Sequence, residues 1–385
     1  MDNDGAPPDR LPALDGLRAL AVAAVMLFHY ETRTYVPGGL FGVDVFFVLS
    51  GFLISSLLVR EWLKGGAISL RGFYVRRVLR IAPAAGVFVL VYLAVVLAFS
   101  GQPLVFGLTS AQAWAQVAWF LSQLYSWGIA LDQLPGSGFS HLWSLSTEEQ
   151  FYLVWPLLLY GLLRRGVRLP VILLLAGSLV LLSAAVPVFL GLPQFYDVYF
   201  RADFRAHSLL AGSMAGMAYA AGYLRVEHVR GLPFRAGLGA AVVYLGYIFF
   251  GMSERQMWAS YAWAMPLVSL AAAFVVVGAA FVRSGPGLAL LANPVVSHIG
   301  RRSYALYLWH FPIGIALAGE GMVAQMALGL PLSLLAAEAS FWLVERPALR
   351  FRRRLLRQAL QSPSPIIVPP AVKPAGSLAL ETPAA

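Results

Sequence analysis

Residues 11–29 read LPALDGLRALAVAAVMLFH, and this stretch decides the fold class because it is apolar and long enough to cross a membrane. It also carries Arg18 and His29, whose ionisable side chains are costly inside hydrocarbon and usually have a function there. If the segment is helical, eleven steps of about 100° bring His29 within roughly 20° of the azimuth of Arg18, about 16 Å further along the axis. The pattern predicts one helix face that holds an anionic substrate at one end and reacts it at the other.

The composition of the whole chain excludes an ordinary soluble domain. Hydrophobic residues make up 59% of the 385 positions and charged residues 12%, with a mean hydropathy of +0.73, which indicates a polytopic membrane protein. The opening segment 1–10 is acidic and Pro-rich, so we expect a first helix that is not cleaved and stays as an anchor. The absence of cysteine excludes disulfides, a thiolate nucleophile and a thiolate metal site.

Ten apolar stretches approach the ~20 residues that a spanning helix needs, and an eleventh is ambiguous. The ambiguous stretch, 113–130, is interrupted by polar side chains and lies in a long loop over 101–148. The ten stretches are 13–31, 39–59, 81–100, 149–163, 169–190, 205–224, 236–251, 258–282, 303–319 and 322–344.

The basic residues decide whether 113–130 spans the membrane. If it does not, 24 of the 28 lysines and arginines lie on the side of the N-terminus, and if it does, the balance becomes 11 against 17. The positive-inside rule favours the first arrangement. We therefore predict an all-α bundle of about ten transmembrane helices in the inner (plasma) membrane, with both termini cytoplasmic and 101–148 as an outer loop. The net charge of +10 then reflects topology rather than nucleic-acid binding.

The same pattern predicts the domain organisation. We expect a cytoplasmic N-terminus over 1–12, one transmembrane domain over 13–347, and a cytoplasmic tail over 348–385. The tail is first basic and then rich in Pro and Ala without helical periodicity from residue 358, so we predict that this part is disordered. No obvious repeat relates the halves of the chain, which disfavours an inverted-repeat transporter.

A basic cluster marks the cytoplasmic mouth of the predicted third helix. The segment FYVRRVLRIAP, 73–83, contains Arg76, Arg77 and Arg80. Arg77 and Arg80 are three residues apart, so their guanidinium groups can converge on one phosphate group. The alternative is charge that only sets the topology and contacts lipid headgroups.

A second polar block, HLWSLSTEEQFY over 141–152, joins the outer loop to the fourth helix. Glu149 has capping-box spacing from Ser146, which favours a helix N-terminal role for it over a catalytic one. A carboxylate and an imidazole near the expected depth of His29 could orient or deprotonate a hydroxyl acceptor. The alternative is a solvated loop with an interfacial tryptophan. The candidate side chains of this block are His141, Trp143, Ser144 and Glu148.

Further candidates lie on three other helices. Asp44 enters the second helix near the expected depth of His29, where it either holds the imidazole tautomer or caps the helix. Arg205 starts the sixth helix from the outer side. Tyr304 and His310 belong to the aromatic stretch SYALYLWHFP, in which a lone histidine is more often a packed core residue than part of a site. The sequence shows no metal-binding constellation, so we expect no metal.

Several of these blocks together resemble the membrane-bound acyltransferase-3 family, bacterial O-acetyltransferases that modify carbohydrates. The resemblance rests on six blocks in the order of the family, and they span residues 11–347. These blocks are LPALDGLRALAVAAVMLFH from residue 11, FGVDVFFVLSGFLI from 41, FYVRRVLRIAP from 73, HLWSLSTEEQFYLVWP from 141, SYALYLWHFP from 303 and LVERP from 343.

The resemblance implies roles for several residues. It makes Arg18 and His29 the functional pair of the family, with acetyl-CoA or another acyl-CoA as the donor and co-substrate and with no permanently bound cofactor. It places the arginine cluster 76–80 near the CoA phosphates, and it favours Glu148 over Glu149. Some relatives carry an esterase-like domain that finishes the transfer, so a partner protein for that step is conceivable.

The expected function is acyl transfer to a hydroxyl of a carbohydrate or glycosylated acceptor, with His29 as general base or transient acyl carrier. A small glycosylated metabolite such as a macrolide is an alternative acceptor. A transporter or flippase of an anionic lipid-linked sugar could use the same arginines. The sequence leaves the acceptor, the acyl chain length and the oligomeric state open.

Overall fold

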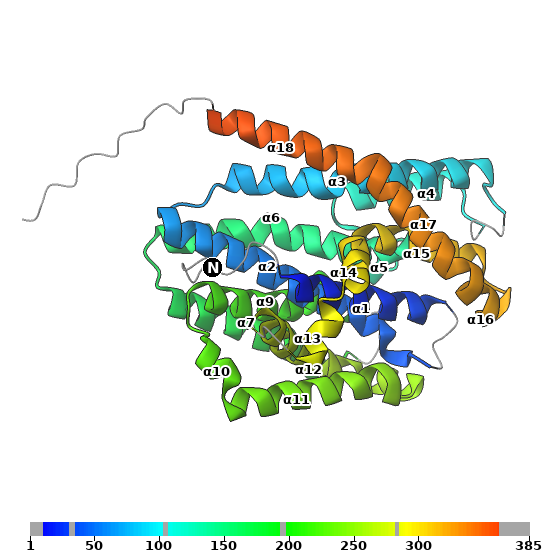
Figure 1. Ribbon diagram of the computed structural model, residues 1–385. Coiled ribbons are helices and arrows are strands. Elements are labelled where there is room, and N and C mark those ends of the chain that lie inside the picture. The colour runs from blue at the N-terminus through cyan, green and yellow to red at the C-terminus, as the bar shows by residue number, and fades with distance from the viewer. Residues whose placement is uncertain (1–10, 31–34, 103–106, 193–197, 282–284, 362–385) are drawn as a thin grey trace, which may run out of the picture.

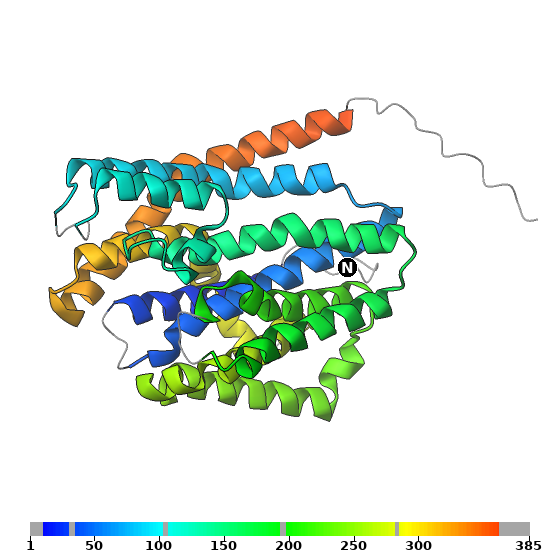
Figure 2. The same ribbon diagram turned by 180° about the vertical axis from the view of Figure 1, so that it is seen from behind.

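The computed structural model describes residues 11–30, 35–102, 107–192, 198–281 and 285–361. Within these ranges the chain forms helices joined by turns, without a strand. The long helices run roughly along one direction and pack side by side (Figures 1 and 2). The predicted all-α polytopic bundle is confirmed.

The helices fall where the apolar stretches predict them. The last stretch is one continuous helical run that includes two π-helical turns, Gln325–Gly329 and Phe341–Glu345. The long helices are α1 Pro12–His29, α2 Gly42–Gly65, α3 Leu70–Ala98, α6 Trp143–Arg164, α7 Leu169–Phe189, α9 Ala202–Ala220, α11 Leu232–Gly246, α12 Glu254–Phe281, α15 Ser303–Ala316, α17 Leu330–Ser340 and α18 Arg346–Gln361. The short helices are α4 Ser110–Leu121, α5 Tyr125–Ala130, α10 Val226–Arg230, α13 Pro286–Leu291, α14 Pro294–Arg301 and α16 Gly321–Ala324, with 3-10 turns at Pro37–Phe41 and Ser140–Leu142 and a further π turn at Tyr247–Gly251.

Seven of the helical segments in the described residues are long and apolar enough to cross a membrane. The predicted spans at 149–163, 205–224 and 303–319 are helical as well, but they are shorter or more polar, so the count of ten remains a prediction. The seven segments are Pro12–His29, Pro37–Gly65, Leu70–Ala98, Leu169–Phe189, Leu232–Gly251, Trp263–Phe281 and Gly321–Leu355.

Residues 107–148, the larger described part of the loop over 101–148, are folded against the bundle. Its ambiguous stretch splits into α4, of 12 residues, and α5, of 6 residues. At 1.5 Å per residue both are far shorter than the ~30 Å of a hydrocarbon core. Phe139 is fully buried against Phe88 of α3, and His141 is 3% exposed. The alternative of a solvated loop at the 141–152 block is therefore wrong.

Two helices extend beyond the predicted limits. Helix α3 begins at Leu70, where Ser69 Oγ accepts a hydrogen bond from the Gly72 N–H at 3.2 Å, so the basic cluster lies inside the helix. Helix α18 runs beside α3 (Figures 1 and 2) and extends to Gln361. The basic part of the predicted tail is thus helical, because its arginines and leucines alternate with helical periodicity, and residues 362–385 lie outside the described part.

Helices α2 and α9 cross at backbone contact through glycines. A Cβ atom at Gly212 would overlap the carbonyl oxygen of Val48, and one at Gly216 would overlap that of Phe52. Gly51 of α2 meets the carbonyl of Leu209 in the same way. The spacing Gly212-x-x-x-Gly216 is the pattern that lets two helices approach closely in a membrane. This crossing fixes the central part of the bundle around which the site is built.

Candidate active site

Three histidines from distant parts of the chain meet at one end of the bundle. His29 ends α1, His141 lies in the turn before α6, and His310 lies in α15. The Nδ1 atom of His29 is 3.1 Å from Nε2 of His310, and the rings of His141 and His310 lie 5.6 Å apart between centroids. The structure thus brings the candidates His141 and His310 beside His29, and we call this cluster the histidine trio.

The neighbouring backbone holds the trio in place. Tyr30 is fully buried, and its hydroxyl lies 2.6 Å from Ser333 Oγ and donates to the carbonyl of His310 at 3.1 Å. His141 Nε2 donates to the carbonyl of Leu308 at 3.1 Å. Burial, followed by the neighbouring His310 and His29, lowers the pKa of His141 well below its usual range, so this ring is neutral.

The structure separates Asp44 from His29. Asp44 and Arg205 are both fully buried and form an ion pair at 3.0 Å, and Ser208 Oγ donates to the second carboxylate oxygen at 2.8 Å. Arg205 also contacts the sulfur of Met265. The expectation that Asp44 holds the imidazole tautomer is wrong, because the nearer guanidinium takes the carboxylate.

Arg205 and Trp143, two further candidates, pack against each other, and neither borders the two cavities described below. Tyr199 packs 4.6 Å from Trp143 between centroids, and the Arg205 guanidinium lies over both rings. Trp143 is 4% exposed. Aromatic rings compensate part of the cost of burying the cation, so these side chains belong to the buried packing between α6 and α9.

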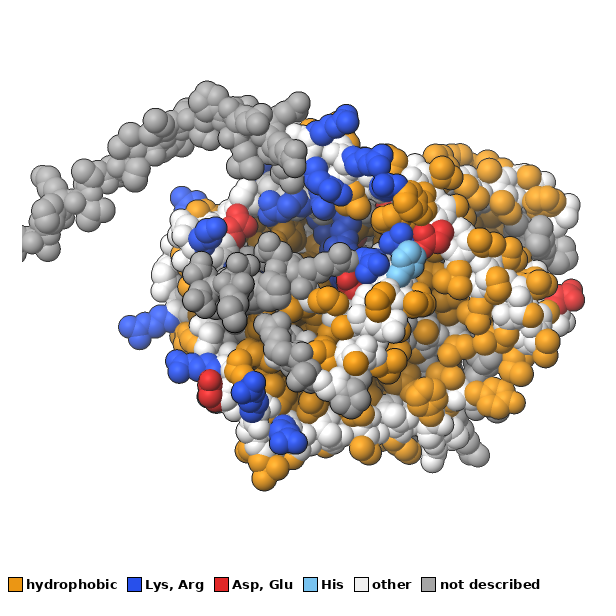
Figure 3. Space-filling view, viewed as in Figure 1, with side chains coloured by type: hydrophobic (Ala, Val, Ile, Leu, Met, Phe, Trp, Pro, Cys, Tyr) orange, Lys and Arg blue, Asp and Glu red, His pale blue; other side chains and the backbone are white. Residues whose placement is uncertain are grey.

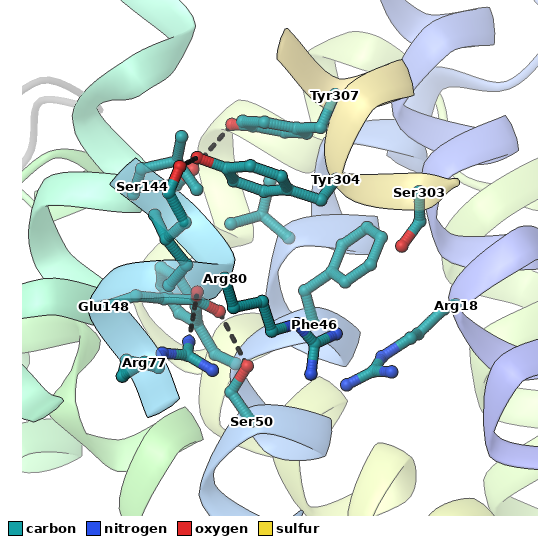
Figure 4. A pocket seen from close by; sticks show the side chains of 14 residues that line it. Arg18, Phe46, Ser50, Arg77, Arg80, Ser144, Glu148, Ser303, Tyr304 and Tyr307 are labelled. Carbon is teal, nitrogen blue, oxygen red and sulfur yellow. Dashed lines mark hydrogen bonds and ion pairs between the residues drawn. The ribbon is translucent and has the colours of Figure 1, made fainter. Parts of the chain in front are cut away.

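Glu148 pairs with Arg77 and not with the histidine trio. Its Oε2 lies 3.7 Å from Arg77, and Ser50 donates to Oε1 at 2.8 Å (Figure 4). The Tyr152 hydroxyl donates to Oε2 at 2.8 Å. We expected Glu148 at the depth of His29. Helix α6 already begins at Trp143, which carries Glu148 about 7 Å into the bundle, to the level that Arg77 reaches from the other end.

Glu148 and Arg77 belong to a narrow cavity of about 80 Å³. The guanidinium groups of Arg18 and Arg80 point towards the same space from α1 and α3 (Figure 4). Tyr307 closes the cavity towards the trio, because its ring lies 5.4 Å from that of His141 and 5.5 Å from that of His310.

Hydrogen bonds fix the tyrosine wall of this narrow cavity. The Tyr307 hydroxyl donates to the carbonyl of His141 at 2.7 Å and lies 2.6 Å from Ser144 Oγ. Tyr304 donates to the carbonyl of Ile81 at 3.0 Å. The structure thus places the candidates Ser144 and Tyr304 in the wall between the arginines and the histidine trio.

A larger cavity of about 740 Å³ lies beside the narrow one and is rich in arginine. We call it the arginine vestibule. The two cavities share Arg18, Arg80, Ser303 and Tyr304 in their walls, so they are neighbours. Lys and Arg side chains gather on this part of the surface, whereas hydrophobic side chains cover the other half of the same face (Figure 3). The charged residues of the vestibule are Arg18, Arg60, Arg80, Arg301, Arg302, Arg352, Asp15 and Glu345.

The basic cluster of the third helix divides into three different environments. Arg80 lines both cavities and Arg77 lines only the narrow one. Arg76 pairs with Glu61 at 3.7 Å, and its carbonyl accepts a bond from Arg352 at 3.5 Å. Arg76 therefore connects α2, α3 and α18. We expected it beside a phosphate ligand, but it lines neither of the two cavities.

Sequence reasoning missed part of the vestibule. Arg60 directly follows the apolar stretch 39–59, Arg301 and Arg302 end the predicted loop 283–302, and Arg352 lies in the predicted tail. Each looks like topogenic charge when it is taken alone. Only the packing of α2, α14 and α18 shows that they face one cavity. Among the described residues no group of three or more His, Asp or Glu could hold a metal ion.

The fold and the site define a membrane-embedded helical bundle with an arginine-lined cavity that leads towards a histidine cluster. The chain belongs to the acyltransferase domain family, whose sequence profile matches residues 11–343. This range contains every element of the site except Glu345 of the π turn and α18.

Curated relatives carry acetyltransferase names. "O-acetyltransferase OatA" of Staphylococcus aureus strain NCTC 8325 is 31% identical over 353 residues, which cover 88% of this chain and 57% of that protein. "Putative O-acetyltransferase SACOL0978" of strain COL is 29% identical over 367 residues, which cover 92% and 59%. The chain thus spans less than two thirds of the length of these relatives. No solved structure matches it.

Proposed function

We propose that this protein is a membrane-bound O-acyltransferase that moves an acyl group, in the first instance acetyl, from acyl-CoA to a hydroxyl of a carbohydrate or glycosylated acceptor. The observation that carries the proposal is that the arginine vestibule shares a wall with the narrow cavity, whose Tyr307 wall touches the histidine trio. Family membership and the names of the relatives support the reaction type.

The vestibule suits the anionic end of the donor. CoA carries its phosphates at one end and the thioester at the other, and arginine forks bind phosphate oxygens through paired hydrogen bonds. In this proposal Arg60, Arg301 and Arg352 hold the nucleotide phosphates, while Arg18 and Arg80 guide the pantetheine arm into the narrow cavity. The arm then displaces Tyr307 to bring the thioester to His29.

The distribution of basic residues gives the proposal its direction. By the positive-inside rule the vestibule faces the cytoplasm, where acyl-CoA is made, and both termini lie on that side of the inner (plasma) membrane. The histidine trio then lies towards the outer side. An acceptor of the cell envelope would meet the acyl group there, and a small glycosylated metabolite such as a macrolide is the alternative acceptor.

His29 performs the chemistry in one of two balanced ways. As a general base, its imidazole takes the proton of the acceptor hydroxyl while the oxygen attacks the thioester carbonyl. The C–S bond breaks, and the departing thiolate receives the proton as CoA-SH. As a nucleophile, the same nitrogen forms a cationic acyl-imidazole and expels the CoA thiolate, which takes a proton from water. In a second step the hydroxyl oxygen takes the acyl group, the imidazole leaves as the neutral ring, and the hydroxyl proton goes to water. Both routes need one imidazole nitrogen with a lone pair.

The first test measures acyl transfer in inverted membrane vesicles that contain the protein. Radiolabelled acetyl-CoA is added outside the vesicles, where the cytoplasmic face of the membrane now points. The two measured quantities are the amount of CoA thiol released and the amount of alkali-labile label in the membrane. We expect His29→Ala to lower both signals at least 100-fold, whereas His228→Ala on an exposed helix leaves them unchanged. Full activity of the His29 variant would overturn the proposal, and a flippase would release no CoA in the wild type.

A further inference from the structure

We propose that His310 is a positioning residue that fixes the tautomer of His29, so that His29 presents Nε2 as its reactive nitrogen. The expected effect on kcat rests on the proposed function. Its structural content concerns the placement of two protons and can be tested without any substrate.

The first proton is placed by the backbone of α15. Nδ1 of His310 lies 2.9 Å from the carbonyl oxygen of Tyr307 and 3.1 Å from that of Leu306. A carbonyl oxygen only accepts, so Nδ1 of His310 must carry the hydrogen. His310 is fully buried, which favours the neutral ring. Its Nε2 is therefore an acceptor.

The second proton follows from the first. Nδ1 of His29 lies 3.1 Å from Nε2 of His310. Because that Nε2 accepts, Nδ1 of His29 donates and carries the hydrogen of the neutral ring. The lone pair of His29 is then on Nε2. A carbonyl, an imidazole and a second imidazole thus form a chain of hydrogen bonds that ends at the reactive nitrogen.

The surroundings prevent His310 from turning away. The ring of His141 meets it edge to face, with 5.6 Å between the ring centroids. The carbonyl of His310 is held by Tyr30, which is itself hydrogen-bonded to α17. In many enzymes a hydrogen-bond partner fixes the tautomer of the histidine that acts as the base, and this partner is often a carboxylate. Here the carboxylate of Asp44 is bound to Arg205.

Two substitutions at His310 separate positioning from packing. His310→Gln places an amide oxygen near the position of Nε2, so it keeps an acceptor for His29 at similar volume. His310→Leu keeps the volume and removes the acceptor. We expect kcat to fall about 100-fold in His310→Leu with little change in KM, and to stay within about tenfold of the wild type in His310→Gln. Equal kcat values in the two variants would overturn the inference.

The tautomer can be read directly. The chain contains six histidines, so nitrogen-15 NMR of histidine-labelled protein in nanodiscs gives few signals, and single substitutions assign them. We expect His29 to carry its hydrogen on Nδ1 in the wild type and in His310→Gln, and to shift towards the Nε2–H form in His310→Leu. An Nε2–H form of His29 in the wild type would overturn the inference. If the tautomer is as expected and His29→Ala remains active, the proposed function fails instead.

Discussion

The arginines of this protein differ sharply in what surrounds them. Arg205 is fully buried and bonded to Asp44, while Arg201 is partly exposed and bonded to Asp203 at 2.7 Å. A buried ion pair is costly to break because the remaining charge cannot reach water. An exposed pair contributes little because water replaces the lost partner.

These two pairs give a matched test of stability. We expect Asp44→Asn to lower the free energy of unfolding by about 3–5 kcal/mol. The corresponding exposed change, Asp203→Asn, should cost less than about 1 kcal/mol. Denaturation of both variants in mixed micelles measures the difference. Equal losses would show that the Asp44 pair is hydrated.

A second residue-scale prediction concerns the donor. If the vestibule binds the nucleotide phosphates, Arg301→Ala and Arg352→Ala should each raise the KM for acetyl-CoA about tenfold and leave kcat unchanged, since one charge-assisted hydrogen bond contributes about 1.5–3 kcal/mol. Arg76→Ala, which removes the neighbouring pair with Glu61, is the control. If one of the two arginines contacts the 3′-phosphate, its alanine variant should also lose the preference for acetyl-CoA over acetyl-dephospho-CoA. If neither variant changes the KM, the vestibule has another ligand.

The sequence alone could identify Arg18 and His29 because one helix carries both, and the helical repeat relates their directions. It could not pair His29 with His310, which lies 281 positions away in the chain. That pairing depends on how α1 packs against α15, and many packings satisfy the same hydropathy. The same reason explains why Asp44 looked like the partner of His29.

At the scale of elements, the α2–α9 crossing depends on small residues. We expect Gly212→Leu to abolish the native crossing and greatly lower the yield of folded protein, because its side chain would overlap the backbone at Val48. Gly239→Leu in α11 has open space around its Cβ position and serves as the control. Size-exclusion profiles in detergent measure both variants. A monodisperse Gly212→Leu protein would show that the helices can separate.

Helix limits were predictable where hydropathy changes at the helix end, as in α1 and α7. They were not predictable for α3 and α18, which continue as polar helices beyond the apolar stretch. Hydropathy reports the membrane core, whereas helix formation also depends on caps and on packing against neighbours. The arginines that reach the vestibule lie largely on such extensions.

At the scale of the whole molecule, the topology makes a simple prediction. The chain has no cysteine, so single cysteines can be labelled without a background. Lys64 and Ser253 are exposed at opposite ends of the predicted bundle. We expect a membrane-impermeant thiol reagent added to intact spheroplasts to label Ser253→Cys and to label Lys64→Cys only after permeabilisation. The reverse pattern would invert the proposed direction of acyl transfer.

The narrow cavity has a consequence for the cell beyond catalysis. A wide aqueous route between the vestibule and the histidines would let protons leak across the membrane and dissipate its energy. At about 80 Å³, and crossed by the pair of Glu148 and Arg77, the cavity holds at most a few water molecules. We therefore expect the resting protein to conduct no protons, and in the proposed mechanism the route opens only while a thioester fills it.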